Sequence, residues 1–175
     1  MTTITLSGTP GSGKSTIAEM LHTYLSIPYV YSGMIFRDLA KQHQMSLEEF
    51  GKYCETHDEV DRELDQKQIE ILQKGNVLLE GRLAGWLAHQ EDIPAVKIMI
   101  TAETDIRVER IIQREGGDFD QCKEALLKRE KSEWKRYKTY YDIDLHDIRI
   151  YDLVIDSSKK SPDQILDIII THLNG

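Results

Sequence analysis

Short uninterrupted apolar runs alternate with segments of helical period along this chain. The apolar runs cover residues 4–6, 29–31, 77–79, 96–100 and 153–155. Uninterrupted apolar strands are typical of parallel sheets, because helices cover such strands on both faces. The pattern therefore predicts an α/β fold with a mostly parallel sheet and helices between its strands.

The first and last helices carry clear signals. Apolar residues from Ile17 to Leu25 share one stripe of a predicted helix over residues 14–25. Near the other end, Ser161 suits an N-cap and Pro162 suits the first turn of a helix that ends at Gly175.

Two charged helical segments, 35–74 and 116–148, look inserted between the sheet elements. In the first, Ser46 and Glu49 form a capping-box pattern for a helix toward residue 54. A second helix is predicted over 58–74, because Gly75 is a typical stop signal.

The motif with the clearest chemistry is Gly-Thr-Pro-Gly-Ser-Gly-Lys-Ser at residues 8–15, between the first strand and the first helix. It satisfies the phosphate-binding pattern G-x-x-x-x-G-K-[ST], in which backbone N–H groups and a helix N-terminus converge on phosphate oxygens. Lys14 is then expected to bridge the terminal phosphates, and the Ser15 hydroxyl is expected to hold Mg²⁺. The predicted ATP-binding residues are Ser7, Gly8, Thr9, Pro10, Gly11, Ser12, Gly13, Lys14, Ser15 and Thr16.

Length and composition narrow the class of protein. At 175 residues the chain fits one domain, 1–175, and its net charge of −8 opposes nonspecific binding to nucleic acid. No apolar stretch is long enough to span a membrane, and the two cysteines lack metal-ligand spacing, so we expect a cytoplasmic protein. Residues 107–138 are locally basic, which favours a compact anionic ligand.

The loop alone leaves the reaction open. The N-K-x-D tetrapeptide of GTPases is absent from the sequence. Glu80, after the third apolar run, could position water in an ATPase that acts as a regulatory or RNA-processing assembly factor. Gly81 and Arg82 follow at once, and an arginine there favours a second anion, so a phosphate is a candidate second substrate.

Six segments in order resemble the short, archaeal-type cytidylate kinases: 7–16, 31–37, 79–85, 110–115, 129–137 and 151–155. The resemblance implies a P-loop NTPase three-layer fold with a five-stranded parallel sheet, a helical NMP-binding insertion at about 33–74 and a helical lid at about 114–138. It also implies transfer of the γ-phosphoryl group of ATP to CMP or dCMP; a kinase for UMP, AMP or another small-molecule acceptor is the alternative. Larger bacterial cytidylate kinases carry Asp after the Gly-Arg pair, where this chain has Leu83.

Several residues of the resembling segments suit an acceptor nucleotide. Ser32, Gly33 and Arg37 would offer a hydroxyl, an open backbone and a cation to a monophosphate, and the resemblance implies that Ser32, Arg37 and Arg82 contact the acceptor. The alternative is that Ser32 caps a helix, Arg37 is solvated and Arg82 pairs with Glu80.

A protein that recognises cytosine needs a hydrogen-bond acceptor for the amino group of the base. Asp61 and Asp65, four residues apart on one helical face, could supply it, although the acidic run around them from Glu55 could equally be a solvated face. The predicted NMP-binding residues are Ser32, Gly33, Arg37, Asp61, Asp65, Gly81 and Arg82.

Arginines recur with helical spacing in the basic segment, at 107, 110 and 114 and again, with Glu133 between them, at 129 and 136. The resemblance implies that Arg110, Arg114, Arg129 and Arg136 line the phosphates; exposed helices with Glu–Arg pairs are the alternative. Gly116 and Gly117 between the two helices would then form a lid hinge. The predicted catalytic residues are Lys14, Arg110, Arg114, Arg129 and Arg136. No general base is needed, since a phosphate oxygen is already anionic. The expected protein is a monomer that uses Mg-ATP.

Overall fold

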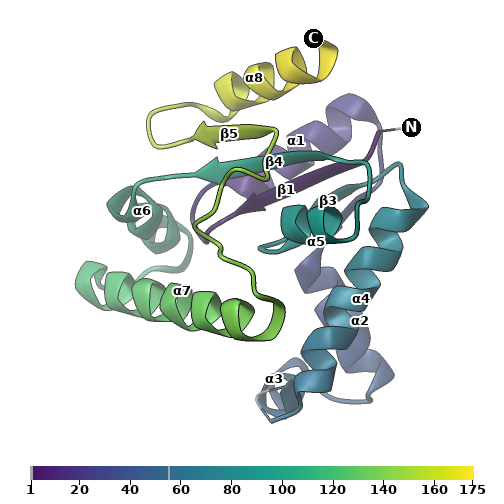
Figure 1. Cartoon of the computed structure of the whole chain (residues 1–175). Helices are drawn as coiled ribbons and strands as arrows, with labels where there is room; N and C mark the ends of the chain where they lie inside the picture. Colours follow the sequence, from purple (N-terminus) through teal and green to yellow (C-terminus); the bar gives the residue numbers. More distant parts are fainter. Residues whose placement is uncertain (1, 55) are drawn as a thin grey trace.

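A five-stranded parallel sheet forms the centre of the molecule (Figure 1). The structure is a computed structural model that describes residues 2–54 and 56–175. The strand order is β2-β3-β1-β4-β5, and each neighbouring pair is parallel. The predicted parallel α/β sheet is confirmed, and its strands are β1 (Ile4–Gly8), β2 (Tyr29–Tyr31), β3 (Leu78–Glu80), β4 (Val96–Thr101) and β5 (Leu153–Asp156).

Helices connect these strands. Their bounds are α1 (Lys14–Leu25), α2 (Ser32–Gln42), α3 (Leu47–Cys54), α4 (Asp58–Lys74), α5 (Ala84–Gln90), α6 (Thr104–Glu115), α7 (Phe119–Tyr141) and α8 (Pro162–Asn174). The predicted caps are confirmed: Ser46 and Glu49 exchange hydrogen bonds before α3, and Ser161 forms a capping box with Gln164 at α8. Glu55 of the acidic run lies outside the described residues.

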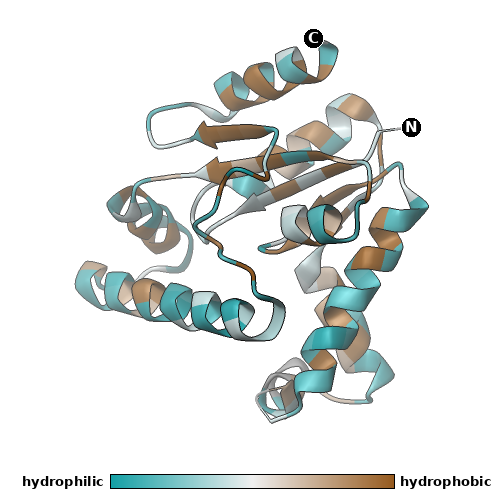
Figure 2. Ribbon diagram, in the orientation of Figure 1, coloured by the Kyte–Doolittle hydropathy of each residue, from teal (hydrophilic) through white to brown (hydrophobic). Residues whose placement is uncertain are grey.

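The sheet has a separate hydrophobic core on each of its two faces. On one face α1 and α8 contribute Ile17, Leu21 and Ile169 to a core with the strands. On the other face α2, α4 and α5 pack together, with Leu39 and Leu72 fully enclosed. In Figure 2 the strands are mostly hydrophobic while much of α7 is hydrophilic. This distribution explains the predicted pattern, because a strand buried on both faces needs no polar alternation.

One strand extends past its apolar run, and one prediction at the strand ends needs correction. β3 includes Glu80, one residue beyond the run 77–79, because Glu80 pairs in register with Leu6 and Tyr31 and its carboxylate has hydroxyl partners inside the fold. The reading of Ser32 as a helix cap is wrong. Ser32 is the first residue of α2, and the N-cap is Tyr31.

The carboxyl ends of β1, β2 and β3 lie at one edge of the sheet, as their register requires. Open parallel sheets bind ligands at this edge. The segments that follow these three strands are the phosphate-binding loop, the start of α2 and the Gly81–Arg82 turn. The fold therefore brings together three of the segments that the sequence singled out.

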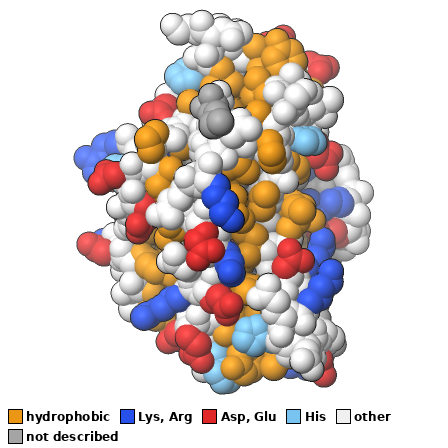
Figure 3. Space-filling view, turned by 90° about the vertical axis from the view of Figure 1, so that its right-hand side faces the viewer, with side chains coloured by type: hydrophobic (Ala, Val, Ile, Leu, Met, Phe, Trp, Pro, Cys, Tyr) orange, Lys and Arg blue, Asp and Glu red, His pale blue; other side chains and the backbone are white. Residues whose placement is uncertain are grey.

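Among the described residues, no helix is long and apolar enough to cross a membrane. Figure 3 shows the face at the right of Figure 1, where acidic, basic and apolar side chains are intermixed. No large patch of one charge gathers on this face.

Candidate active site

The phosphate-binding loop connects β1 to α1 in a conformation that its glycines make possible. Gly11 has φ +78°, and a Cβ atom there would lie 2.7 Å from the backbone oxygen of Arg107. An L side chain would therefore be both strained and crowded at this position. The loop consequently packs directly against α6, which brings the arginines of α6 to its edge.

Lys14 and Ser15 begin α1 and face the end of β3. The Ser15 hydroxyl donates a hydrogen bond to Glu80 Oε1 at 2.9 Å, and Lys14 Nζ lies 4.0 Å from the same oxygen. The Tyr29 hydroxyl donates to the other oxygen of Glu80. Burial lowers the pKa of Lys14, and the Glu80 carboxylate partly opposes that effect. Glu80 is thus held by three residues and is not free to turn into a cavity.

The Ser15 hydroxyl oxygen and Glu80 Oε1 suit a magnesium ion that is bound together with nucleotide phosphates. Mg²⁺ prefers oxygen ligands and is usually held by one or two protein groups plus phosphates. The Ser15 hydroxyl keeps its lone pairs available while its proton points to Glu80. The described residues contain no cluster of three or more His, Cys, Asp or Glu that could hold a metal alone, so a metal here would depend on the nucleotide.

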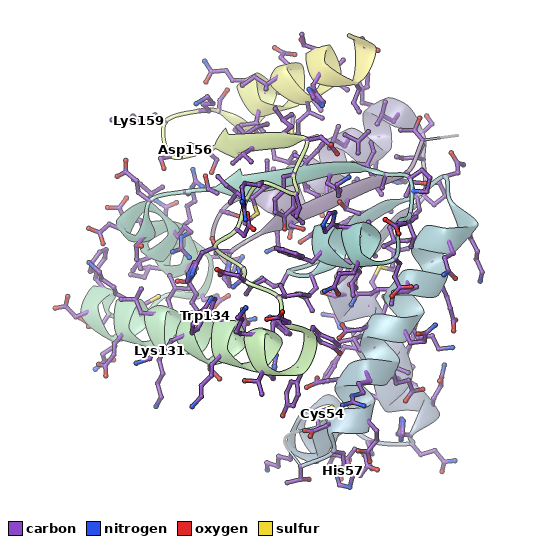
Figure 4. All side chains as sticks on the ribbon, in the orientation of Figure 1. Cys54, His57, Lys131, Trp134, Asp156 and Lys159 are labelled. Atoms are coloured by element: carbon purple, nitrogen blue, oxygen red, sulfur yellow. The ribbon has the colours of Figure 1, made fainter. Side chains whose placement is uncertain are left out.

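A cavity of about 500 Å³ opens over this loop, and we call it the loop cavity. Residues 10–17 form its floor, and Arg110, Arg114 and Arg129 line its side. The segment after β5 closes the far end through Ser157, Lys160, Pro162 and Ile165. Figure 4 labels Asp156 at the end of β5 and Lys159 on this segment. The predicted loop residues Ser7, Gly8 and Thr9 do not line the cavity; the buried Ser7 hydroxyl instead accepts a hydrogen bond from the Gly85 N–H at 3.1 Å.

Arg107 and Arg110 share a helical face but make different contacts. Arg107 is buried and binds Glu130 of α7 and the backbone oxygen of Ala102. Arg110 donates to the backbone oxygens of Gly11 and Ser12, each at 3.2 Å, and to Ser157. Arg110 therefore fixes the shape of the loop from the wall of the cavity, whereas Arg107 ties α6 to α7.

A second cavity of about 370 Å³, the insertion cavity, lies between α4, α7 and the end of β3. The predicted residues Ser32, Asp61, Asp65, Arg82, Arg129 and Arg136 line it. Gly33, Arg37 and Gly81 are not among its lining residues, and the exposed Arg37 donates to the Tyr31 hydroxyl at 2.8 Å. Arg129 lines both cavities, so the two spaces meet at this side chain.

Glu133 of α7 holds two of these arginines. Its Oε2 accepts from Arg82 Nε at 2.8 Å, and its Oε1 accepts from Arg129 Nε at 2.9 Å. Arg82 Nη2 also lies 2.8 Å from Oε2, whereas Arg129 meets Glu133 through Nε alone. Arg82 therefore keeps Nη1, and Arg129 keeps both terminal nitrogens, for an anion. Arg82 therefore pairs with Glu133 and not with Glu80.

Sequence reasoning missed several residues that line the insertion cavity. They are Phe36, Cys54, Leu64, Gln68, Leu83, Glu133 and Tyr137. Cys54 is labelled in Figure 4 at the end of α3. A signal for Gln68 was present, because it follows Asp61 and Asp65 at spacings of seven and three on the same face of α4. Tyr137 likewise follows Glu133 by one turn of α7.

Comparison with known proteins identifies the family. The model of the cytidylate kinase-like family matches residues 3–159. The chain belongs to the cytidylate kinase-like family. A cytidylate kinase from Methanocaldococcus jannaschii is 46% identical over 173 residues, which cover 98% of this chain and 97% of that protein. One from Pyrococcus horikoshii is 44% identical over 98% of this chain and 89% of its own length.

The solved structures agree on the fold of this member of the cytidylate kinase-like family. Shikimate kinase from Bacteroides thetaiotaomicron superposes with a TM-score of 0.66 at 12% identity, covering 99% of each chain. The resemblance to cytidylate kinases and the P-loop kinase fold, both expected from the sequence, are confirmed. The family member is an enzyme of the kinase class.

Proposed function

We propose that this chain transfers the γ-phosphoryl group of Mg-ATP to CMP or dCMP, giving CDP or dCDP and ADP. The observation that carries the proposal is the junction of two cavities at Arg129, one built on a phosphate-binding loop and the other lined by three arginines. The 44–46% identity to cytidylate kinases over nearly the whole chain supports the choice of acceptor.

ATP is assigned to the loop cavity. Backbone N–H groups of residues 10–16 and the Lys14 ammonium would bind its phosphates, and Ser15, oriented by Glu80, is the residue that would hold Mg²⁺. When bound, the ion would supply positive charge to the phosphates. The nonpolar Pro162 and Ile165 at the far end suit the base of the nucleotide.

The acceptor nucleotide is assigned to the insertion cavity, with its phosphate toward Arg82 and Arg129. One of its phosphate oxygens attacks the γ-phosphorus, the bond to the β–γ bridging oxygen breaks, and ADP leaves with that electron pair. The acceptor oxygen is already an anion, so no general base takes part. Lys14, Arg110, Arg114, Arg129 and Arg136 are proposed to align and neutralise the phosphates.

The helices suggest how water is excluded. We assign residues about 33–74 as the NMP-binding insertion and about 114–138 as the lid within one domain, 1–175. Gly116 and Gly117 separate α6 from α7, with φ values of +78° and +112°. Apart from atoms of the adjacent residues, no heavy atom of the described part of the chain lies within 4 Å of a Cβ position at either glycine. A hinge at this point would let α7 close over both cavities. We further propose a cytoplasmic monomer without nucleic-acid or membrane partners.

The experiment that tests this function measures coupled ADP release from Mg-ATP with CMP, dCMP, UMP, AMP or GMP added separately, beside a tube without acceptor. Fast turnover with CMP or dCMP is expected. Equal, slow ADP release in every tube would contradict the proposal and would favour an ATPase.

A further inference from the structure

Asp65 occupies a defined position in the wall of the insertion cavity. It lies in the middle of α4 with 8% of its surface exposed. It also lines a smaller cavity of about 80 Å³ between α4 and the C-terminal part of α7. A carboxylate placed in the wall between two cavities can meet a ligand in either of them.

Two donors hold the Asp65 carboxylate in place. The Tyr141 hydroxyl, from the last residue of α7, donates to Oδ2, and Gln68 Nε2 donates to Oδ1 at 3.2 Å. Each carboxylate oxygen accepts up to two hydrogen bonds, so each keeps one acceptor site. The side chain therefore has a fixed orientation and unused acceptor capacity.

Gln68 is itself fixed by its surroundings. It is 3% exposed, and a Cβ atom at Gly81 would lie 3.1 Å from its Oε1. Because Gly81 has no side chain, the amide of Gln68 can occupy the space beside it. The amino end of Gln68 consequently points to Asp65, which makes Gln68 a donor to the carboxylate, while its buried Oε1 has no hydrogen-bond partner among the described residues.

Charged and titratable groups from α3, α4, α7 and the turn after β3 line the two cavities beside Asp65. From α3 comes Cys54, from the turn after β3 comes Arg82, and α4 adds Asp58, Asp61 and Arg62. The groups from α7 are Arg129, Glu133, Arg136, Tyr137, Tyr140 and Tyr141. Arg136 opposes protonation of Asp65, whereas Asp61 favours it.

The chemistry of this position distinguishes the two common pyrimidines. Cytosine carries an amino group at C4, which donates hydrogen bonds, whereas uracil carries an oxygen there, which accepts them. An ionised carboxylate only accepts. It therefore binds the cytosine amine and opposes the uracil oxygen.

We propose that Asp65, oriented by Tyr141 and Gln68, accepts the exocyclic amino group of the acceptor base and thereby selects cytosine over uracil. This inference rests on the proposed function, since it needs a pyrimidine in the insertion cavity. Asp61 lines the same cavity one turn earlier, but among the described residues no hydrogen bond fixes its carboxylate. Tyr141 and Gln68 are positioning residues, because they act through Asp65.

The test compares kcat/KM for CMP and for UMP in the wild type, Asp65→Asn and Asp61→Asn. Asparagine keeps the size of aspartate but adds an amino donor that suits uracil, so D65N should lower the CMP-to-UMP ratio about tenfold or more. D61N, a matched loss of charge on the same helix face, should keep the ratio within about twofold of the wild type. A D65N ratio equal to the wild type, or a ratio that falls with D61N instead, would overturn the proposal.

The proposed kinase function and the assignment of Asp65 would be contradicted by different results. A wild type that phosphorylates neither pyrimidine nucleotide would contradict the proposed function and, with it, this inference. A wild type that prefers CMP while D65N keeps the same preference contradicts only the assignment of Asp65. Circular dichroism shows whether each variant is folded. Calorimetric titration with CMP and with UMP in the absence of ATP measures their affinities without depending on turnover.

Tyr141→Phe tests the positioning residue. Removing its hydroxyl frees one carboxylate oxygen, so the CMP-to-UMP ratio should fall severalfold and kcat with saturating CMP should change less than KM. A purely structural role would lower the unfolding temperature and leave the ratio unchanged. That outcome would overturn the part assigned to Tyr141.

Discussion

Ser15 at the start of α1 and Glu80 at the end of β3 are joined by a hydrogen bond of 2.9 Å that spans 65 residues of sequence. The bond directs the proton of the Ser15 hydroxyl to Glu80 and leaves the oxygen lone pairs available to a cation. It also connects the phosphate-binding loop to the turn that carries Arg82. In the proposed kinase site, Glu80 would therefore orient Ser15 and would not position water.

The first prediction follows from that bond. Glu80→Gln should raise the Mg²⁺ concentration that gives half-maximal activity by about tenfold, because a neutral amide orients Ser15 less well and attracts the ion less. Titrations of activity with Mg²⁺ measure this effect, and calorimetric titration of Mn²⁺ with ADP provides a readout without turnover. An unchanged metal requirement would remove Glu80 from the metal site.

The second prediction concerns Lys14. Lys14→Ala should reduce kcat by about two orders of magnitude or more, because the ammonium neutralises charge on the phosphates. Lys67→Ala is the control, since Lys67 is a half-exposed lysine of α4 paired with Glu70. A folded K14A protein with wild-type turnover would exclude the loop lysine from the reaction.

The third prediction separates two arginines of α6. Arg110→Ala should raise KM for ATP and lower the free energy of unfolding by about 1–3 kcal/mol, because Arg110 bonds the loop and Ser157. Arg114→Ala should reduce kcat and leave stability unchanged, since the Arg114 side chain is 65% exposed and pairs with its neighbour Glu115. Kinetics and urea unfolding of both variants decide between these roles. Equal losses of stability would contradict the distinction.

The fourth prediction is the pH dependence of base selection. Burial raises the pKa of Asp65 from 3.8 to about 6, with a smaller contribution from Asp61. The CMP-to-UMP ratio of kcat/KM should therefore be constant at alkaline pH and fall as pH drops through about 6, where the acid becomes a donor to uracil. Ionisation of the acceptor phosphate cancels in the ratio. D65N should give a flat profile; a parallel fall in both proteins would assign the titration to another group.

The fifth prediction is the effect of the same group on stability. Because the folded pKa of Asp65 is raised, its stabilising contribution is present below pH 3.8 and is lost as pH rises through about 6. Ionised Asp65 then costs up to about 3 kcal/mol of unfolding free energy. Relative to D65N, the wild type should lose stability between about pH 4 and 6 and show a constant difference above that range. Urea unfolding of both proteins across this range provides the measurement.

Local signals made much of the fold predictable. The stop at Gly75, the cap at Ser161 and the loop before Lys14 each depend on neighbouring residues, and all three are confirmed. The apolar run stops one residue short of the end of β3 because Glu80 is a charged residue in a buried strand. Its burial is possible because the hydroxyls of Ser15 and Tyr29 satisfy it, and these partners lie far away in the sequence.

Side-chain contacts between residues far apart in the sequence could not be predicted for the site. Helical spacing correctly placed Arg107 and Arg110 on one face, but spacing does not say which of them is buried against α7. Likewise Arg82 finds Glu133 because α7 crosses the end of the sheet, and that crossing depends on tertiary packing. The sequence thus supplied the candidate residues, whereas the fold decided their partners.

Arg129 contacts both substrate spaces while its Nε is bound to Glu133. In the proposed reaction, the first nucleotide to bind would order the terminal nitrogens of this side chain and would bear the conformational-entropy cost of doing so. The second nucleotide would then meet an arginine that is already ordered. Thermodynamic linkage makes this advantage equal in both directions, so ATP and its acceptor should each tighten the binding of the other in either order of addition.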